Sequence, residues 1–157
     1  MIDSLKNMLS DSDFGLEELL PDLSGLEALL TTVLRWAVVL GPLCLLGMGL
    51  WLFLAAPKEA NHKAGYRTFW GMSSVESWQF TQRAAGLVWT ALGLGLTIAM
   101  ALRVNGYRDL EYEAAIWSAI EALGLELVLI LASIVAVNIA VFVAFDRKGY
   151  RRRRKRR

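Results

Sequence analysis

The chain has 157 residues, the size of one domain, and 55% of them are hydrophobic, with a mean hydropathy of +0.41. This proportion is too high for an ordinary soluble fold, so the composition excludes most soluble proteins and indicates an integral membrane protein. The net charge of +2 hides an asymmetry, because residues 1–34 hold seven acids and one base whereas residues 146–157 are almost wholly basic.

Residues 1–34 are predicted to form an acidic amphipathic segment outside the membrane. Leucines recur at helical spacing over residues 14–34, with acids between them. Pro21 and the Ser24-Gly25 pair interrupt this pattern, so we expect a short interfacial helix, a bend and a second helix that continues into the membrane. Because an acidic face does not favour anionic lipid, the segment is expected to dock on another protein or to rest on the outer leaflet through its leucines.

Three apolar blocks follow, at Trp36–Ala55, Ala84–Leu102 and Leu125–Phe145. Each has about 20 residues, which as a helix spans the roughly 30 Å hydrocarbon core of a bilayer. They carry almost no charge on any face, unlike the core helices of a soluble bundle. The predicted fold is all-α and integral to the membrane, with a three-span module over residues 35–146 and a basic tail over residues 147–157.

Small residues recur in these blocks. Gly41-Pro42 predicts a kink, and glycines such as Gly49 and Gly93 predict faces where another helix can come close. Such residues are common in any transmembrane helix, so the pattern alone does not decide between specific packing and ordinary composition. The single cysteine, Cys44, lies in the middle of the first block and is expected to have a packing role.

The loop after the first block, "ANHKAGYRTFWGMSS", is the richest in polar and aromatic residues. The guanidinium of Arg67 is a fixed fork of donors suited to a carboxylate, a lipid phosphate or helix-end carbonyls. Alternatively, the polar side chains satisfy backbone groups within a compact turn, and the sequence leaves both roles open. The candidate functional residues of this loop and of the helix after it are Asn61, Gly65, Tyr66, Arg67, Thr68, Trp78 and Gln82.

A helix is predicted to begin just after this loop. Ser73 and Glu76 have the spacing of a capping box, in which each side chain accepts a backbone N–H of the other residue. The helix should continue without interruption through the second block, with Trp78 and Gln82 on one face. Arg83 is expected to reach lipid phosphate at the membrane surface.

The tripeptide Gly-Tyr-Arg occurs three times, at residues 65–67, 106–108 and 149–151, each time after a predicted span. Each copy is typical of a helix end, because glycine stops the helix, tyrosine favours the interface and arginine reaches phosphate. Only the first copy has Asn61, Thr68 and a helix cap around it. We therefore expect a functional element at the first copy and simple helix ends at the other two.

The third block contains two polar side chains, Glu126 and Asn138. Polar groups inside a membrane indicate a functional role by default. Glu126 lies within a turn of the outer boundary of the block and is expected to be hydrated. Asn138 lies deeper and is expected to form a hydrogen bond with another helix.

No catalytic machinery is visible in the sequence, so the protein is predicted not to be an enzyme and to need no cofactor. His62 is the sole histidine, and no cysteine or acid stands at metal-ligand spacing from it. Catalytic triads and glycine-rich nucleotide motifs are also missing from the sequence.

The basic tail is expected to contact anionic lipid headgroups, at about 1 kcal/mol per basic residue. Nucleic-acid binding is not predicted, because a folded reading element is missing from the sequence. The lipid-contacting residues predicted here, besides Arg83, are Arg151, Arg152, Arg153 and Arg154.

The charges of the flanking segments predict one orientation. Residues 56–83 and the tail are basic, whereas the N-terminal segment and residues 103–124 are rich in acids. The positive-inside rule then places the N-terminus and the 103–124 loop outside, and the 56–83 loop and C-terminus in the cytoplasm.

The pattern of the loop and of the helix after it resembles the SdpI family of bacterial membrane proteins over about residues 57–103. The residues that carry the resemblance are Asn61, Gly65, Tyr66, Arg67, Thr68, Ser73, Ser74, Trp78 and Gly86. The name-giving members confer immunity to a secreted killing factor, so the resemblance implies a protein of the bacterial inner membrane that protects against a membrane-active peptide. Larger members have more spans than this chain.

Protection would require a peptide toxin to bind at small-residue helix faces and at the acidic N-terminal segment. Because three helices bury few polar groups, a homo-oligomer or a partner membrane protein is also expected. Two alternatives remain: a transport or channel subunit in which Arg67, Glu126 and Asn138 line a path at an oligomer axis, or an assembly subunit of a larger membrane complex.

Overall fold

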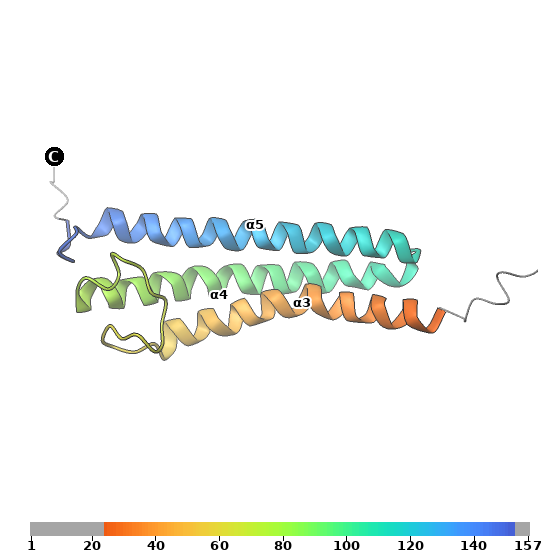
Figure 1. Cartoon of the computed structure of the whole chain (residues 1–157), viewed down its shortest axis with the longest axis horizontal. Coiled ribbons are helices and arrows are strands. Elements are labelled where there is room, and N and C mark those ends of the chain that lie inside the picture. The colour runs from red at the N-terminus through yellow and green to blue at the C-terminus, as the bar shows by residue number, and fades with distance from the viewer. Residues whose placement is uncertain (1–23, 153–157) are drawn as a thin grey trace, which may run out of the picture.

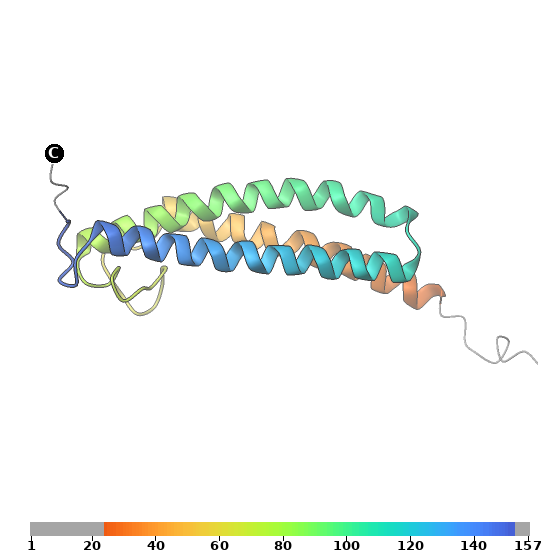
Figure 2. The same cartoon turned by 90° about the horizontal axis from the view of Figure 1, so that it is seen from above.

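The structure is a computed structural model and describes residues 24–152, apart from the side chains of residues 24, 108 and 109. Its elements are α3 (Ser24–Leu54), α4 (Val75–Asn105), the short 3-10 helix η1 (Gly106–Asp109) and α5 (Tyr112–Ala144). The three long helices lie side by side (Figures 1 and 2), and α4 packs most extensively on α3. The prediction of an all-α fold is confirmed for the described residues. The predicted interfacial helix before Ser24, as well as Arg153 and Arg154, lies outside them.

All three long helices have the length and apolar composition needed to cross a membrane, which confirms the three predicted spans. Successive helices run in opposite directions, so the 55–74 loop and the end of the described chain share one end of the bundle (Figure 1). The start of α3 and the α4–α5 turn lie at the opposite end. We call these the loop end and the turn end.

The connection between α4 and α5 is shorter than predicted. Residues 103–124 were expected to form a loop, but α4 continues to Asn105 and α5 begins at Tyr112. No proline interrupts residues 112–124, and their charged side chains are compatible with a helix. With 33 residues, α5 is about 50 Å long and exceeds the thickness of a hydrocarbon core.

The first long helix confirms that the segment after Gly25 continues into the membrane. It passes through Pro42 as one helix, and its axis bends near the middle (Figure 1). Proline removes one backbone hydrogen bond and crowds the preceding turn, which explains a bend at this position. Cys44 faces outward rather than into the bundle, so its expected packing role is wrong.

Glycines bring the backbones of α3 and α4 together. A Cβ on Gly86 would lie 2.6 Å from the backbone nitrogen of Phe53, and a Cβ on Gly93 would lie 2.5 Å from that of Leu46. Gly49 of α3 makes an equally close approach to α4. These glycine faces are therefore occupied by contacts within the chain, so they are not the docking surface that the sequence suggested.

The start of α4 is capped one residue later than predicted. Ser74 is the N-cap, and its Oγ accepts from the backbone N–H of Ser77 at 3.1 Å while Ser77 Oγ accepts from the N–H of Ser74 at 3.2 Å. Ser73 instead donates to the carbonyl of Phe69 at 3.2 Å. Glu76 is exposed and takes no part in the cap, because the buried Ser77 hydroxyl holds that position.

Candidate functional site

The 55–74 loop is a folded cap over the loop end of the bundle. Asn61 begins its turn by accepting the N–H groups of Lys63 at 2.9 Å and Ala64 at 2.8 Å on its Oδ1. Gly65 follows with φ of +112°, a left-handed conformation that glycine adopts without strain. A Cβ at Gly65 would also lie 2.7 Å from the ring of Trp78. Glycine is therefore required here by both conformation and space.

Two side chains of α4 fasten this loop to the helix. Gln82 accepts the backbone N–H of Tyr66 on its Oε1 and donates from Nε2 to the carbonyl of the same residue, both at 2.8 Å. Trp78 donates from its indole Nε1 to the carbonyl of Pro57 at 2.7 Å. Trp78 and Gln82 are both buried, which confirms that they lie on one inward face of the helix. Together they hold both halves of the loop in register.

Arg67 and Thr68 both bond backbone groups of the loop. Arg67 donates from Nη1 to the carbonyl of His62 at 2.7 Å, and Thr68 Oγ1 accepts the N–H of Gly71 at 2.9 Å. These side chains therefore satisfy backbone groups within the loop, which was one of the two roles that the sequence left open. Arg67 is nevertheless exposed, and most of its donor atoms have no hydrogen-bond partner within residues 24–152. Its guanidinium can bind a carboxylate or phosphate without leaving the loop.

Tyr66 links the loop to the third helix. Asn138 donates from Nδ2 to the hydroxyl oxygen of Tyr66 at 3.0 Å and to the carbonyl of Ile134 at 2.9 Å. The prediction that Asn138 bonds another helix is therefore wrong, because its partner, Tyr66, belongs to the loop. Burial raises the pKa of the Tyr66 hydroxyl, and the hydrogen bond from Asn138 lowers it in part. The phenol therefore remains a neutral hydrogen-bonding group.

One aromatic contact and one hydrogen bond around this link were not predicted. The ring of Tyr66 packs edge-on against Trp89, with 5.0 Å between centroids, and Trp89 donates from Nε1 to Ser133 Oγ at 3.1 Å. A tryptophan within a span needs a partner for its N–H, and a serine on another span is a suitable acceptor. The need for an acceptor could have predicted a hydrogen bond from Trp89, although it does not identify Ser133 as the partner.

A groove opens sideways between the loop and α5, and we call it the lateral groove. Its volume is about 660 Å³, and its polar groups are Arg67, Thr68 and the hydrogen-bonded Tyr66–Asn138 pair. The groove joins an apolar helix face to a short polar rim. The remaining lining residues are Phe69, Trp70, Ile134, Val135, Ile139 and Phe142.

Two arginines of the C-terminal segment lie beside the lateral groove. Arg147 lies over the ring of Trp70, with 6.0 Å to its centroid, and Arg152 lies over Phe142 at 5.0 Å. Cation–π contacts of this kind hold a guanidinium against an aromatic face while leaving N–H groups for an anion. The polar rim of the groove is therefore positively charged.

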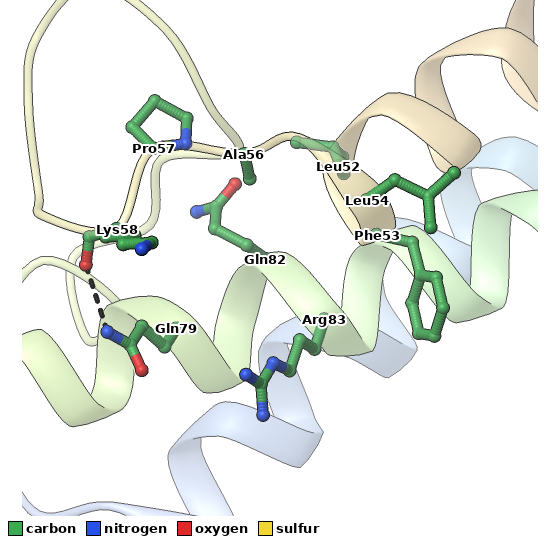
Figure 3. A pocket seen from close by; sticks show the side chains of 9 residues that line it. All are labelled: Leu52, Phe53, Leu54, Ala56, Pro57, Lys58, Gln79, Gln82 and Arg83. Atoms are coloured by element: carbon green, nitrogen blue, oxygen red, sulfur yellow. Dashed lines mark hydrogen bonds between the residues drawn. The ribbon is translucent and has the colours of Figure 1, made fainter.

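A smaller hollow of about 220 Å³ lies on the other side of the loop, between the end of α3 and α4 (Figure 3). Phe53 and Leu54 form its apolar part, and Lys58 and Arg83 stand on either side of it. Gln79 donates to the carbonyl of Lys58 at 3.2 Å. This arrangement suits the predicted contact between Arg83 and lipid phosphate, which stays a prediction.

The first residues of the basic tail are folded rather than extended. Phe145 and Arg151 form an antiparallel bridge, and Gly149 has φ of +76° in the turn between them. Ser74 donates from Oγ to the carbonyl of Gly149 at 2.8 Å, which docks this turn on the start of α4. Arg152 also donates from Nε to the carbonyl of Phe145 at 3.1 Å. Residues 147–152 therefore belong to the membrane module.

The three Gly-Tyr-Arg copies have different roles. Gly65 and Gly149 both have positive φ and both pack on the first turns of α4, whereas Gly106 has an ordinary φ of −70° and begins η1. Tyr107 is buried and Tyr150 is 70% exposed. The second copy ends α4 as expected, because Gly106 is its C-cap, whereas the third copy is more than a simple helix end, because it docks against the start of α4.

Glu126 is separated from this site. It is 4% exposed and packs against Gly41 of α3, so the expectation of a hydrated carboxyl is wrong. Its position is 12 residues from Asn138, about 18 Å along α5. The structure thus brings Arg67 and Asn138 together in the lateral groove but does not align Glu126 with them. That arrangement gives no support to the path proposed for a channel subunit.

Within residues 24–152 no group of histidine, cysteine, aspartate and glutamate side chains could hold a metal ion. The model of the SdpI/YfhL protein family matches residues 58–144, which is more than half of the chain. The matched stretch contains the loop, α4 and α5 and begins after α3. No curated protein and no solved structure matches the chain.

Proposed function

The chain belongs to the SdpI/YfhL family of proteins, and from this membership we propose that it protects the membrane that contains it against a membrane-active peptide. Name-giving members confer immunity to a secreted killing factor. The observation that carries the proposal is the lateral groove, which is open to the outside of the bundle and combines an apolar floor with a cationic, hydrogen-bonding rim. A membrane-inserted peptide offers the matching groups, because it has an apolar face and a carboxylate or free carbonyls at its end.

The exposed surface of α5 extends this binding face. The glycine faces of α3 and α4 are occupied, whereas α5 presents a continuous series of bare apolar side chains beside the groove. A second helix can pack along such a stripe within lipid. The residues of the stripe, each at least 45% exposed, are Leu127, Val128, Leu131, Val135, Ile139, Phe142 and Val143.

The proposed setting is the bacterial inner membrane, with the loop end in the cytoplasm. Lys58, Lys63, Arg67 and Arg147 all belong to the loop end, in agreement with the positive-inside rule. A peptide inserted in the bilayer can reach the lateral groove from the side without crossing the protein. A homo-oligomer or a partner membrane protein would use the same exposed stripe, so either would compete with the peptide.

The test is survival of sensitive cells that express the protein and are challenged with the killing factor that the name-giving members neutralise. Val135→Trp fills the groove, whereas Ile98→Trp places the same ring on a comparably exposed position of α4, outside both the groove and the stripe. We expect protection by the wild type and by Ile98→Trp, and its loss in Val135→Trp at equal abundance in the membrane. Equal protection by both variants would exclude the groove, and no protection by the wild type would exclude the function.

A further inference from the structure

Glu126 is a buried acid that the proposed function does not use. Its Oε1 is buried and has no hydrogen-bond partner in the part of the chain that the structure describes, and its side chain faces α3. Oε2 lies 3.0 Å from the position that a Cβ on Gly41 would occupy. The carboxyl group therefore packs directly on the backbone of α3, where a side chain at residue 41 would displace it.

Among the described side chains, no cation is paired with this carboxyl. On α4 the nearest charged residue toward the turn end is Arg103, which pairs with Glu121 of α5 at 3.0 Å. On α3 the nearest is Arg35, six residues before Gly41. Arg35 forms no salt bridge with the side chains that the structure describes, and its Nε has no hydrogen-bond partner among them.

Tyr107, on the same side, is buried, and its hydroxyl has no hydrogen-bond partner among the described residues. Toward the loop end, α4 carries no charged residue before Arg83, and α3 carries none before its end at Leu54. An ionised Glu126 would thus face an apolar membrane interior without a counter-charge, a costly arrangement.

The turn of α3 that Glu126 contacts includes a proline, which removes one hydrogen-bond donor from the helix. Pro42 has no N–H, so the carbonyl of Val38, four residues earlier, lacks its usual helical donor. Val38 and Pro42 are both fully buried, so water does not reach the Val38 carbonyl to replace the missing donor. A neutral carboxylic acid carries one O–H donor, which is the group that this turn lacks.

We propose that Glu126 is a proton-binding site within the bilayer, where the neutral carboxylic acid donates its O–H to the carbonyl of Val38 and thereby joins α5 to the bend of α3. The proton comes from water, and its release to water leaves a carboxylate against the α3 backbone. Loss of the proton loosens the contact between α3 and α5, so the position of α5 depends on pH.

Infrared difference spectroscopy of the full chain in liposomes tests the protonation directly. We expect the C=O stretching band of a protonated carboxylic acid at neutral pH, a shift of that band when glutamate is isotope-labelled, and its loss in Glu126→Gln. Glu121→Gln is the matched control, because Glu121 is an exposed acid already paired with Arg103, and this variant should keep the band. A wild-type spectrum without the band at neutral pH would overturn the proposal, whether or not the variants fold.

The acceptor and the pH dependence have separate tests. Pro42→Ala supplies the missing N–H to the carbonyl of Val38, so we expect the carboxylic acid band to shift to the position of a weaker hydrogen bond. The folded wild type holds a proton that the unfolded chain has released, so its stability should fall as the pH rises, and Glu126→Gln should remove that dependence. An unshifted band in Pro42→Ala, or an unchanged pH dependence in Glu126→Gln, would contradict the proposal.

Discussion

Adding a single methyl group at Gly93 should separate α3 from α4, whereas the same change two residues away should not. A Cβ on Gly93 would lie 2.5 Å from the nitrogen and 2.7 Å from the Cα of Leu46, where ordinary contact begins at 3.4 Å. The helices must therefore move apart by about 1 Å, and overpacking of this kind costs about 1–3 kcal/mol. Gly95 has nothing within 4 Å of its added Cβ, so Gly95→Ala gains helix propensity without a clash.

The difference between the two alanine variants isolates the contact, because the gain in helix propensity is common to both. Reversible unfolding in mixed detergent micelles, followed by circular dichroism, should show Gly93→Ala to be less stable than Gly95→Ala by about 1–3 kcal/mol. Gly86→Ala should resemble Gly93→Ala, since its Cβ would lie 2.6 Å from the nitrogen of Phe53. Equal stability of Gly93→Ala and Gly95→Ala would refute the close packing of α3 on α4.

Three further predictions concern the loop end. Gln82→Ala leaves the N–H and carbonyl of Tyr66 without partners, so it should cost about 1–3 kcal/mol in the same unfolding assay and increase proteolysis of the loop. Asn138→Leu removes the hydrogen bond that lowers the pKa of Tyr66, so spectrophotometric titration should find a still higher pKa for this tyrosine. Because the tyrosine of the unfolded chain ionises first, at about pH 10, the free energy of unfolding should fall above that pH. Ser74→Ala removes the cap of α4 and the bond to Gly149, at a cost of about 1–2 kcal/mol, and fluorescence of a C-terminal label should report a freer tail.

Much of the architecture follows from local properties of the sequence. Length and hydropathy determine whether a segment can cross a bilayer, so the three spans could be predicted without knowing their neighbours. The four-residue period also identified Trp78 and Gln82 as one face of α4, because helix geometry alone sets that relation. In the candidate site, Asn61 and Gly65 were recognisable because their side-chain chemistry and conformation are specific to turns.

The remaining features depend on contacts between distant residues. Glu126 is buried because Gly41 of another helix leaves room for its carboxyl, which no property of the third block shows. Likewise, Ser77 rather than Glu76 completes the cap because its hydroxyl also donates to carbonyls of the folded loop. The partner of Asn138 could not be identified for the same reason, since a polar group in a span indicates a hydrogen bond without indicating its other end.

The two ends of the bundle differ in how completely their polar groups are satisfied. At the loop end, side chains of α4 and α5 hold the loop and the C-terminal turn through a series of hydrogen bonds. Toward the turn end, Arg35 Nε and Tyr107 Oη are buried and have no hydrogen-bond partner among the described residues. Unsatisfied buried groups cost free energy, so the contacts around them open more easily than a fully bonded region. Motion of α5 should therefore begin near the turn end and pivot about the loop end, which keeps the lateral groove intact while the surroundings of Glu126 change.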